Sequence, residues 1–215
     1  MLWNQFDSNI LIKPYRETLK ASRHYNGKGV ATYPGGDTYD GYFKDGIRHG
    51  PNGVYTFSTK GGEESKDTYR GDWEHNLKHG IGKQIYTGVG EYNGYWQKGE
   101  RHGEGVMIYK NKDIYSGMWK AGKKDGHGTY VFNDTGMKYV GTFKNGELIQ
   151  GKWLYPNGSF FQGNFENNKP KGKGTWHFIN GNTVEGDYTQ IKRADVKEEN
   201  VIKLSWATRA AWFSH

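Results

Sequence analysis

The chain of 215 residues contains no cysteine. Disulfide bonds, thiolate metal sites and cysteine nucleophiles are therefore excluded, and a cytoplasmic location is expected. Large apolar residues are scarce as well, since Leu, Ile, Val and Phe together make up about 17% of the chain, a level typical of disorder. No stretch approaches the roughly 18 apolar residues of a membrane-spanning helix. The first twenty residues show no basic segment followed by a long apolar run, so no signal peptide is expected.

Aromatic residues and glycine are abundant instead. Phe, Trp and Tyr account for 16% of the residues, and 33 residues are glycine. Disordered chains are depleted of aromatic residues, so this composition argues against disorder. Glycine costs about 1 kcal/mol in a helix interior, and the composition therefore favours short strands joined by tight turns.

A modest basic excess is the third feature of the composition. The net charge is +7 and the isoelectric point is about 9.3. Nucleic acid, anionic lipid or an acidic protein could each use such a charge. The lysines recur singly and form no block, which indicates a solvated surface more than a dedicated binding patch. Nucleic-acid binding is not predicted, because the aromatic residues recur at a fixed phase that structural packing explains.

A repeat organises most of the sequence. An aromatic residue, any residue, glycine, any residue and a second aromatic residue recur with starts 30, 23, 23, 24, 22 and 23 residues apart. The long first spacing contains a polar insertion near residues 58–68, which is expected to protrude as a loop. A weaker seventh copy starts at Val184. The six clear copies are Tyr39, Gly41 and Phe43; Tyr69, Gly71 and Trp73; Tyr92, Gly94 and Trp96; Tyr115, Gly117 and Trp119; Tyr139, Gly141 and Phe143; and Phe161, Gly163 and Phe165.

Two further motifs follow in most units, in the same order. The first is a short glycine-containing segment and the second is an aromatic residue followed by a turn. The glycine-containing segments are RHGPNG from Arg48, KHGIG from Lys78, RHGEG from Arg101, KDGHG from Lys124 and PKGKG from Pro170.

These motifs have a simple physical interpretation. Residues i, i+2 and i+4 of a strand share one face, so the two rings and the glycine of each copy point the same way. The glycine leaves a notch across which a ring of the neighbouring hairpin can lie. Single hairpins are unstable in water, but stacked hairpins stabilise one another through their interfaces. The predicted fold is therefore all-β: an elongated, single-layer, twisted antiparallel meander of tandem β-hairpins.

At this point the residues resemble a known family. The segment YNGYWQKGERHGEGVMIYKNKDIYSGMW, from Tyr92 to Trp119, is similar to two consecutive MORN repeats (membrane occupation and recognition nexus). The predicted organisation is a non-repeat N-terminal cap over residues 1–24, an array of about seven units over 25–188, and a C-terminal tail over 189–215. The unit from Tyr139 lacks the His-Gly-x-Gly segment, which leaves its local register open.

The resemblance implies a scaffold for other proteins. The closing part of the array, with its NGN-x-x-EG-x-Y ending at Tyr188, is similar to MORN-containing radial-spoke head proteins. It implies a structural component of the radial-spoke head in the axoneme of a cilium or flagellum, with partners in a multi-subunit cytoskeletal assembly. A peripheral membrane tether that binds anionic phospholipid is the alternative. A homodimer also stays open, because such arrays pair through edges or ends.

No catalytic, cofactor or metal site is predicted. His49, His79 and His102 occupy equivalent repeat positions about 10 Å apart, too far for one ion with bonds near 2 Å. The recurring Gly-x-Gly leads into aromatic-rich strands and not into the helix that a phosphate loop requires. The chain is therefore not expected to be an enzyme.

The tail differs in kind from the repeats because it lacks glycine. Aromatic and aliphatic side chains without a repeat partner can anchor another protein or fold back over the last hairpin, and both alternatives stay open. The candidate anchors are Leu204, Trp206, Trp212 and Phe213.

Overall fold

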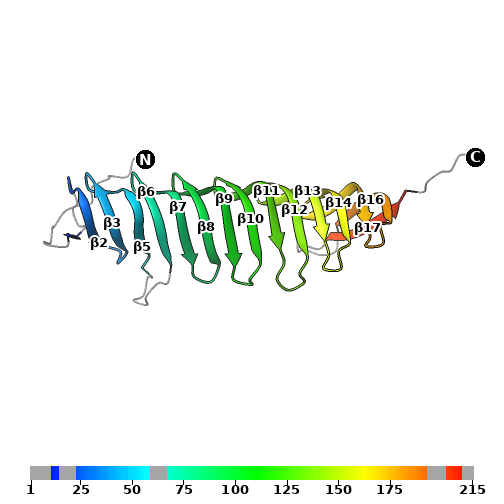
Figure 1. The fold of residues 1–215 in the computed structure, drawn as a ribbon, viewed down its shortest axis with the longest axis horizontal. Coiled ribbons are helices and arrows are strands. Elements are labelled where there is room, and N and C mark those ends of the chain that lie inside the picture. Colours follow the sequence, from blue (N-terminus) through cyan, green and yellow to red (C-terminus); the bar gives the residue numbers. More distant parts are fainter. Residues whose placement is uncertain (1–10, 15–22, 59–66, 193–201, 210–215) are drawn as a thin grey trace, which may run out of the picture. The chain divides into compact units, whose positions relative to one another are not determined.

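The structure, a computed structural model, describes residues 11–14, 23–58, 67–192 and 202–209 (Figure 1). Its regular elements are all strands, and no helix occurs among these residues. The chain divides into two compact units. The first comprises residues 1–110 and 119–122, and the second comprises residues 111–118 and 123–215.

The first unit is a meander in which each strand pairs antiparallel with the next. Strand β1 pairs with β2, β3 pairs with β4 and β5, and the order then runs without a crossover to β9. Its strands are β1 (Leu11–Pro14), β2 (Gly27–Thr32), β3 (Thr38–Lys44), β4 (Ile47–Arg48), β5 (Gly50–Thr56), β6 (Thr68–Glu74), β7 (Leu77–Tyr86), β8 (Gly90–Gln97) and β9 (Glu100–Tyr109).

The second unit repeats this arrangement from β11 to β17. Strand β10 (Ile114–Lys120) contributes its first five residues to this unit. The other strands are β11 (Lys123–Val131), β12 (Lys138–Lys144), β13 (Glu147–Leu154), β14 (Phe160–Glu166), β15 (Lys169–His177), β16 (Thr183–Lys192) and β17 (Ile202–Thr208). The prediction of an all-β antiparallel meander of consecutive hairpins is thus confirmed.

A row of glycines crosses the strands of each unit. In the first unit Gly71 pairs with Gly82, which pairs with Gly94, which pairs with Gly105. In the second, the row runs through Gly128, Gly141, Gly151, Gly163, Gly174 and Gly186. A Cβ atom placed on Gly94 would lie 2.4 Å from the Cα atom of Gly105, so the strands meet too closely for any side chain there.

The ring that lies across each notch differs from the expectation. The expectation is a ring from the neighbouring hairpin. In the structure the ring belongs to the same strand as the glycine of the aromatic motif, as Tyr69 does for Gly71. A Cβ on Gly71 would lie 2.5 Å from the hydroxyl oxygen of Tyr69, and one on Gly82 would lie 2.4 Å from the same atom. Tyr69, Tyr92, Tyr115 and Phe161 each cover the glycine of their own strand and that of the following strand, whereas the nearest atoms at Gly141 and Gly151 are backbone atoms.

The first glycine of the His-Gly-x-Gly segment has a separate role. Gly80 and Gly103 have φ angles of +56° and +57°, and the pairing registers of β6 with β7 and of β8 with β9 shift beside them. These glycines form bulges that bend the return strand. The unit from Tyr139 has no such glycine, yet its register also shifts, between Thr142 and Phe143. Gly151 then occupies the glycine row, so this departure from the motif leaves the hairpin intact.

The short turns are left-handed at both central residues. Lys98 and Gly99 have φ angles of 51° and 87°, and Ala121 and Gly122 have 49° and 74°. This is the geometry of the two-residue type I′ turn that suits hairpin twist. The Gly99 amide also donates a hydrogen bond of 2.9 Å to the carbonyl oxygen of Lys78 in the preceding hairpin. Each turn therefore links consecutive repeats as well as two strands.

The polar insertion lies mostly outside the described residues, since residues 59–66 fall there. Its two ends are held together. Thr56 pairs with Thr68, and the Phe57 amide donates to the carbonyl oxygen of Asp67 at 3.1 Å. The strands are thus closed before the insertion begins.

Candidate interaction surfaces

The repeat aromatics form the core of the first unit as a ladder of near-perpendicular ring pairs. Edge-to-face packing of this kind is worth about 0.5–1.5 kcal/mol per pair beyond the area that it buries. Tyr39, Tyr69 and Tyr92 are fully buried, and Phe43, Trp73 and Trp96 are at most 5% exposed. The ring centroids are 5.3 Å apart for Tyr39 and Trp73, 5.2 Å for Tyr69 and Trp73, 5.2 Å for Tyr69 and Trp96, 5.3 Å for Tyr92 and Trp96, and 5.2 Å for Tyr92 and Trp119.

The second unit continues the pattern with more phenylalanine. The ring centroids of Tyr115 and Phe143 are 5.0 Å apart, and those of Tyr139 and Phe165 are 5.9 Å apart. Tyr115, Phe143, Phe161 and Phe165 are buried, whereas Tyr139 is half-buried. The predicted repeat residues are thus brought together by the fold, each within its own unit, and act as packing groups.

The polar atoms of these rings are satisfied by the backbone. The hydroxyl of Tyr92 donates to the carbonyl oxygen of Tyr95 at 3.0 Å, three residues along the same strand. The indole N–H of Trp96 donates to the carbonyl oxygen of Gly82 at 3.0 Å, and that of Trp119 donates to Gly105 at 3.1 Å. Buried polar groups of an aromatic core need such partners, and these three rings find theirs within the protein.

A set of cations inside the ladder was not predicted. In the first unit each cation lies over the second aromatic residue of the following copy. The Arg48 guanidinium carbon lies 4.5 Å from the Trp73 ring centroid, and the Lys78 ammonium lies 4.7 Å from that of Trp96. Arg101 lies 4.4 Å from Trp119 in the same way. Each contact is a cation–π interaction.

The second unit has one such cation and then loses it. Lys124 lies 4.8 Å from the Tyr130 ring. Buried Leu148 and Pro170 take the equivalent places opposite Phe143 and Phe165. The fixed phase of the basic residue in the second motif was the available signal for these contacts.

Burial changes the chemistry of Lys78. Desolvation by the surrounding rings, together with the positive charges of Arg48 and Arg101, lowers the pKa of Lys78 to about 8. The Lys78 ammonium donates to the Gln84 side-chain oxygen at 2.5 Å. This arrangement is structural, because the ammonium faces rings and an amide.

The repeated histidines do not form a metal site. His49 packs edge-on against His75 with centroids 5.9 Å apart, and the Nδ1 atom of His79 lies 3.3 Å from a carboxylate oxygen of Glu74. Among the described residues, no group of three potential metal ligands comes together.

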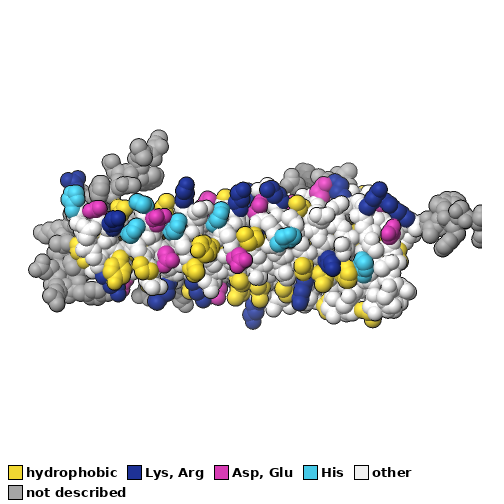
Figure 2. Space-filling model, turned by 45° about the horizontal axis from the view of Figure 1, so that its top comes forward, with side chains coloured by type: hydrophobic (Ala, Val, Ile, Leu, Met, Phe, Trp, Pro, Cys, Tyr) yellow, Lys and Arg dark blue, Asp and Glu magenta, His cyan; other side chains and the backbone are white. Residues whose placement is uncertain are grey.

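The face opposite the ladder is exposed. In the first unit it carries Tyr42, Ile81 and Tyr95, which are 48%, 60% and 51% exposed. Ile81 and Tyr95 are direct cross-strand neighbours. The same face also carries charged side chains, among them Lys83 and Glu91, which form an ion pair at 2.8 Å. Figure 2 shows hydrophobic side chains of the first unit scattered among polar and charged ones on the face in view.

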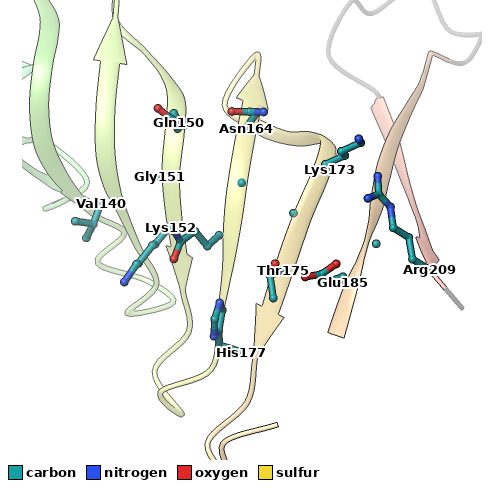
Figure 3. A pocket seen from close by; sticks show the side chains of 14 residues that line it. Val140, Gln150, Gly151, Lys152, Asn164, Lys173, Thr175, His177, Glu185 and Arg209 are labelled. Carbon is teal, nitrogen blue, oxygen red and sulfur yellow. The ribbon is translucent and has the colours of Figure 1, made fainter. Parts of the chain in front are cut away.

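The same face of the second unit is hollowed into a groove of about 690 Å³, here called the polar groove (Figure 3). Part of the glycine row forms its floor, from Gly151 to Gly186. Gln150, Asn164 and Lys173 lie along one side of it, as Figure 3 shows. The other lining residues are Val140, Lys152, Gln162, Thr175, His177 and Glu185, with Arg209 at the β17 end.

The tail lies partly within the described residues. Strand β17 pairs with β16, and the rings of Trp206 and Tyr188 are 4.7 Å apart. Trp206 and Leu204 are half-buried on β17. Trp212 and Phe213 lie outside the described residues. At the other end, β1 pairs with β2, and the predicted domain boundaries stay a prediction.

The repeated hairpins and their ring ladder define a class of protein: an all-β repeat scaffold that offers surfaces to other molecules. The family model of the MORN repeat matches residues 24–38, 39–61, 69–88, 92–114, 115–137 and 161–183, and the chain belongs to the MORN-repeat family. The hairpin from Tyr139 is not among these matches, although its strands and glycine follow the same plan. Repeats of this family generally mediate protein or lipid interactions and are not catalysts.

No curated protein matches the chain. Within the part of the chain that the structure describes, no helix has the length and hydropathy that a membrane crossing requires.

Proposed function

We propose that the protein is a non-catalytic scaffold and protein-interaction module, and a component of the radial-spoke head in the ciliary axoneme. One observation carries the general part of this proposal. The rings of the ladder are buried against one another, so the exposed surface that can meet partners lies on the opposite face, with Tyr42, Ile81 and Tyr95 in the first unit and the polar groove in the second. Exposed aromatic side chains are over-represented in protein interfaces.

The axonemal part is supported by the last repeats. The ending NGN-x-x-EG-x-Y, which resembles the closing repeats of radial-spoke head proteins, lies on the hairpin of β15 and β16. Gly186 of this hairpin continues the glycine row, and Tyr188 packs on Phe161 with centroids 5.0 Å apart. The closing repeat is thus built into the sheet, with β15 paired to β14 and β16 paired to β17.

Fractionation of cilia tests the proposal. The full chain carrying an epitope tag is expressed in ciliated cells, axonemes are extracted with detergent, and cross-linked neighbours are identified by mass spectrometry. The expected result is retention in the detergent-resistant axoneme with cross-links to spoke-head subunits. Complete loss into the soluble fraction, with no axonemal cross-link, would contradict the axonemal assignment.

A peripheral membrane tether is the second candidate, and one surface feature favours it. Phe178 and Ile179 sit in the connection between β15 and β16 and are 43% and 75% exposed. An apolar loop tip on a protein of net charge +7 suits the interface of an anionic bilayer. Sedimentation with phosphatidylserine vesicles at low salt tests it. Binding that Ile179→Ser abolishes would support the tether, and a protein that stays in the supernatant would remove it.

A further inference from the structure

The polar groove has a floor without side chains. Gly151, Gly163 and Gly174 are in register on adjacent strands and show only backbone to the groove, because residues at these positions face the ladder: Cβ atoms on Gly163 and Gly174 would lie 2.6 and 2.3 Å from the Phe161 ring. The backbone groups on the floor are engaged in the pairing of β13 to β16, so they are not available to a ligand. Recognition in the groove must therefore come from the side chains along its two sides.

Those side chains are suited to a polypeptide. Gln150, Gln162 and Asn164 are exposed amides, and each has both donor and acceptor groups for the peptide bonds of a guest chain. The glycine floor of the groove, from Gly151 to Gly186, crosses four strands, about 14 Å at a strand spacing of roughly 4.8 Å. An extended chain advances about 3.4 Å per residue, so some four or five residues would fill it.

The charged side chains in the groove indicate the charge that its ligand should carry. Lys152 and Lys173 line it, and neither forms an ion pair with a carboxylate of the described residues. The Lys152 ammonium lies 4.7 Å from the Phe160 ring centroid, which leaves its donors available. Arg209 is engaged by Asp187 at 2.9 Å. Glu185 is the one acidic group among the lining residues, so the groove keeps a positive excess.

The equivalent positions of the first unit show a different chemistry. Val54 and Val106 correspond to Lys152, and Ile81 and Glu104 correspond to Lys173, each counted from the glycine of its return strand. Lys83 does match Lys152, but Glu91 neutralises it at 2.8 Å. Lys28, one residue before Gly29, matches Lys173, so the contrast between the two units rests on the positions of Val54, Ile81, Glu104 and Val106.

We propose that the polar groove binds an extended acidic segment of a partner protein, with Lys152 and Lys173 pairing two of its carboxylates and the amides holding its backbone. The inference rests on the proposed role as a protein-interaction scaffold and names the chemistry of one partner. A concave trough fits a chain better than a flat bilayer. The one aromatic ring among its lining residues, His177, is already stacked on Phe160 with centroids 4.3 Å apart, so bases find no free stacking platform and a nucleic acid is disfavoured.

The test uses the full chain and a defined probe. A fluorescein-labelled octapeptide of alternating glutamate and serine is titrated at low salt, and its glutamine counterpart is the uncharged control. The binding variant is Lys152→Gln with Lys173→Gln. The matched control is Lys144→Gln with Lys203→Gln, which removes the same charge from two exposed lysines of the second unit that do not line the groove. Side-chain amide signals of Gln150, Gln162 and Asn164 in NMR spectra report the location.

The expected result is saturable binding of the glutamate peptide with shifts of these amide signals. The groove variant should weaken binding about tenfold, as the loss of two charge-assisted contacts requires, and the control variant should leave it within about twofold. Equal weakening by the two variants, equal binding of the glutamine peptide, or shifts elsewhere would overturn the proposal. Groove-dependent binding of phosphatidylserine vesicles without peptide binding would also overturn it. None of these outcomes decides the axonemal proposal, because fractionation of cilia follows the wild-type chain and does not depend on the groove. Failure of the one proposal can therefore be told apart from failure of the other.

Discussion

At Gly94 the absence of a side chain is a structural requirement. Its built Cβ would lie 2.4 Å from the Cα of Gly105 and 2.7 Å from the carbonyl oxygen of Glu104. Both are backbone atoms, which cannot turn away as the end of a side chain could. Gly35 in a loop has the opposite environment, since no atom lies within 4 Å of its built Cβ.

Gly94→Ala should therefore destabilise the protein by about 1–3 kcal/mol through overpacking. Gly35→Ala should stay within about 0.5 kcal/mol of the wild type. Urea unfolding followed by circular dichroism measures both. Similar losses for the two variants would show that the glycine row does not set the spacing of the strands.

Lys78 gives a residue-scale prediction in the alkaline range. Its pKa of about 8 lies below the value near 10.4 of an unfolded chain, so between these values the unfolded state binds more protons. The Lys78 contribution to the free energy of unfolding should then rise with pH from about 8 to about 10. The measurement is the pH dependence of urea unfolding in the wild type and in Lys78→Met. The difference between the two curves should change over this range, and a constant difference would contradict the lowered pKa.

The residue scale also shows what spacing alone can predict. The i, i+2, i+4 pattern placed Tyr69, Gly71 and Trp73 on one face, because alternation along a strand is fixed by geometry. It could not tell which strand supplies the ring over each glycine, since that depends on side-chain torsions. It also missed the place of Arg48 and Lys78 between the rings, which follows only from the pairing of β3 with β4 and of β6 with β7.

At the scale of the elements, the two-residue turns vary in how well their sequences suit their geometry. Asn145 and Gly146 adopt φ angles of 52° and 99°, and Asn-Gly is the preferred pair for a type I′ turn. Ala121 adopts a φ of 49° at the same turn position, where its Cβ is disfavoured by roughly 1 kcal/mol or more. The two turns therefore form a natural pair for exchange.

Ala121→Asn should stabilise the protein by about 0.5–1 kcal/mol, and Asn145→Ala should destabilise it by a similar amount. Thermal unfolding of both variants and of the double variant gives the comparison. Changes of the same sign in the two single variants would be incompatible with the left-handed turn geometry.

Hairpins were predictable and the groove was not, for one reason. The residues that form a hairpin are adjacent in the sequence, so their pattern can be recognised there. Even the irregular unit from Tyr139 forms its hairpin, with Gly141 paired to Gly151. The polar groove instead brings Gln150, Asn164 and Lys173 together from three strands, and a shift by one residue in any of them would turn its side chains to the other face. Bulges set that register, and the sequence gives no rule for their exact effect.

At the scale of the whole molecule, most of the buried core residues are aromatic, with few aliphatic side chains such as Met107 and Leu148 among them. Burial raises the pKa of Tyr39, Tyr55, Tyr69 and Tyr92 well above the usual value, and it raises the pKa of Tyr139 to about 12. Unfolding would release all of these hydroxyls into water, where they ionise near pH 10. The stability of the fold therefore depends on several buried tyrosines whose hydroxyl groups would ionise over the same pH range once the chain unfolds.

This dependence predicts alkaline unfolding. The stabilisation from neutral buried tyrosines is fully present below about pH 10 and is lost as the pH rises toward the folded-state values, because only the unfolded chain ionises in between. Phenolate absorbance and the strand signal in circular dichroism should therefore change together in one transition. Early ionisation of most tyrosines with an unchanged strand signal would refute this account.

The closed pair at Phe57 and Asp67 has a practical consequence for labelling. The two ends of the insertion are joined by the backbone hydrogen bond between Phe57 and Asp67, so the pairing of the flanking strands does not depend on the length of the segment between them. The entropy of closing a longer connection grows slowly, by about 0.6 kcal/mol for each doubling of its length. A fluorescent reporter or affinity sequence placed between Ser58 and Asp67 should thus leave the repeats in place, which makes this position the natural one for following the protein inside a cell.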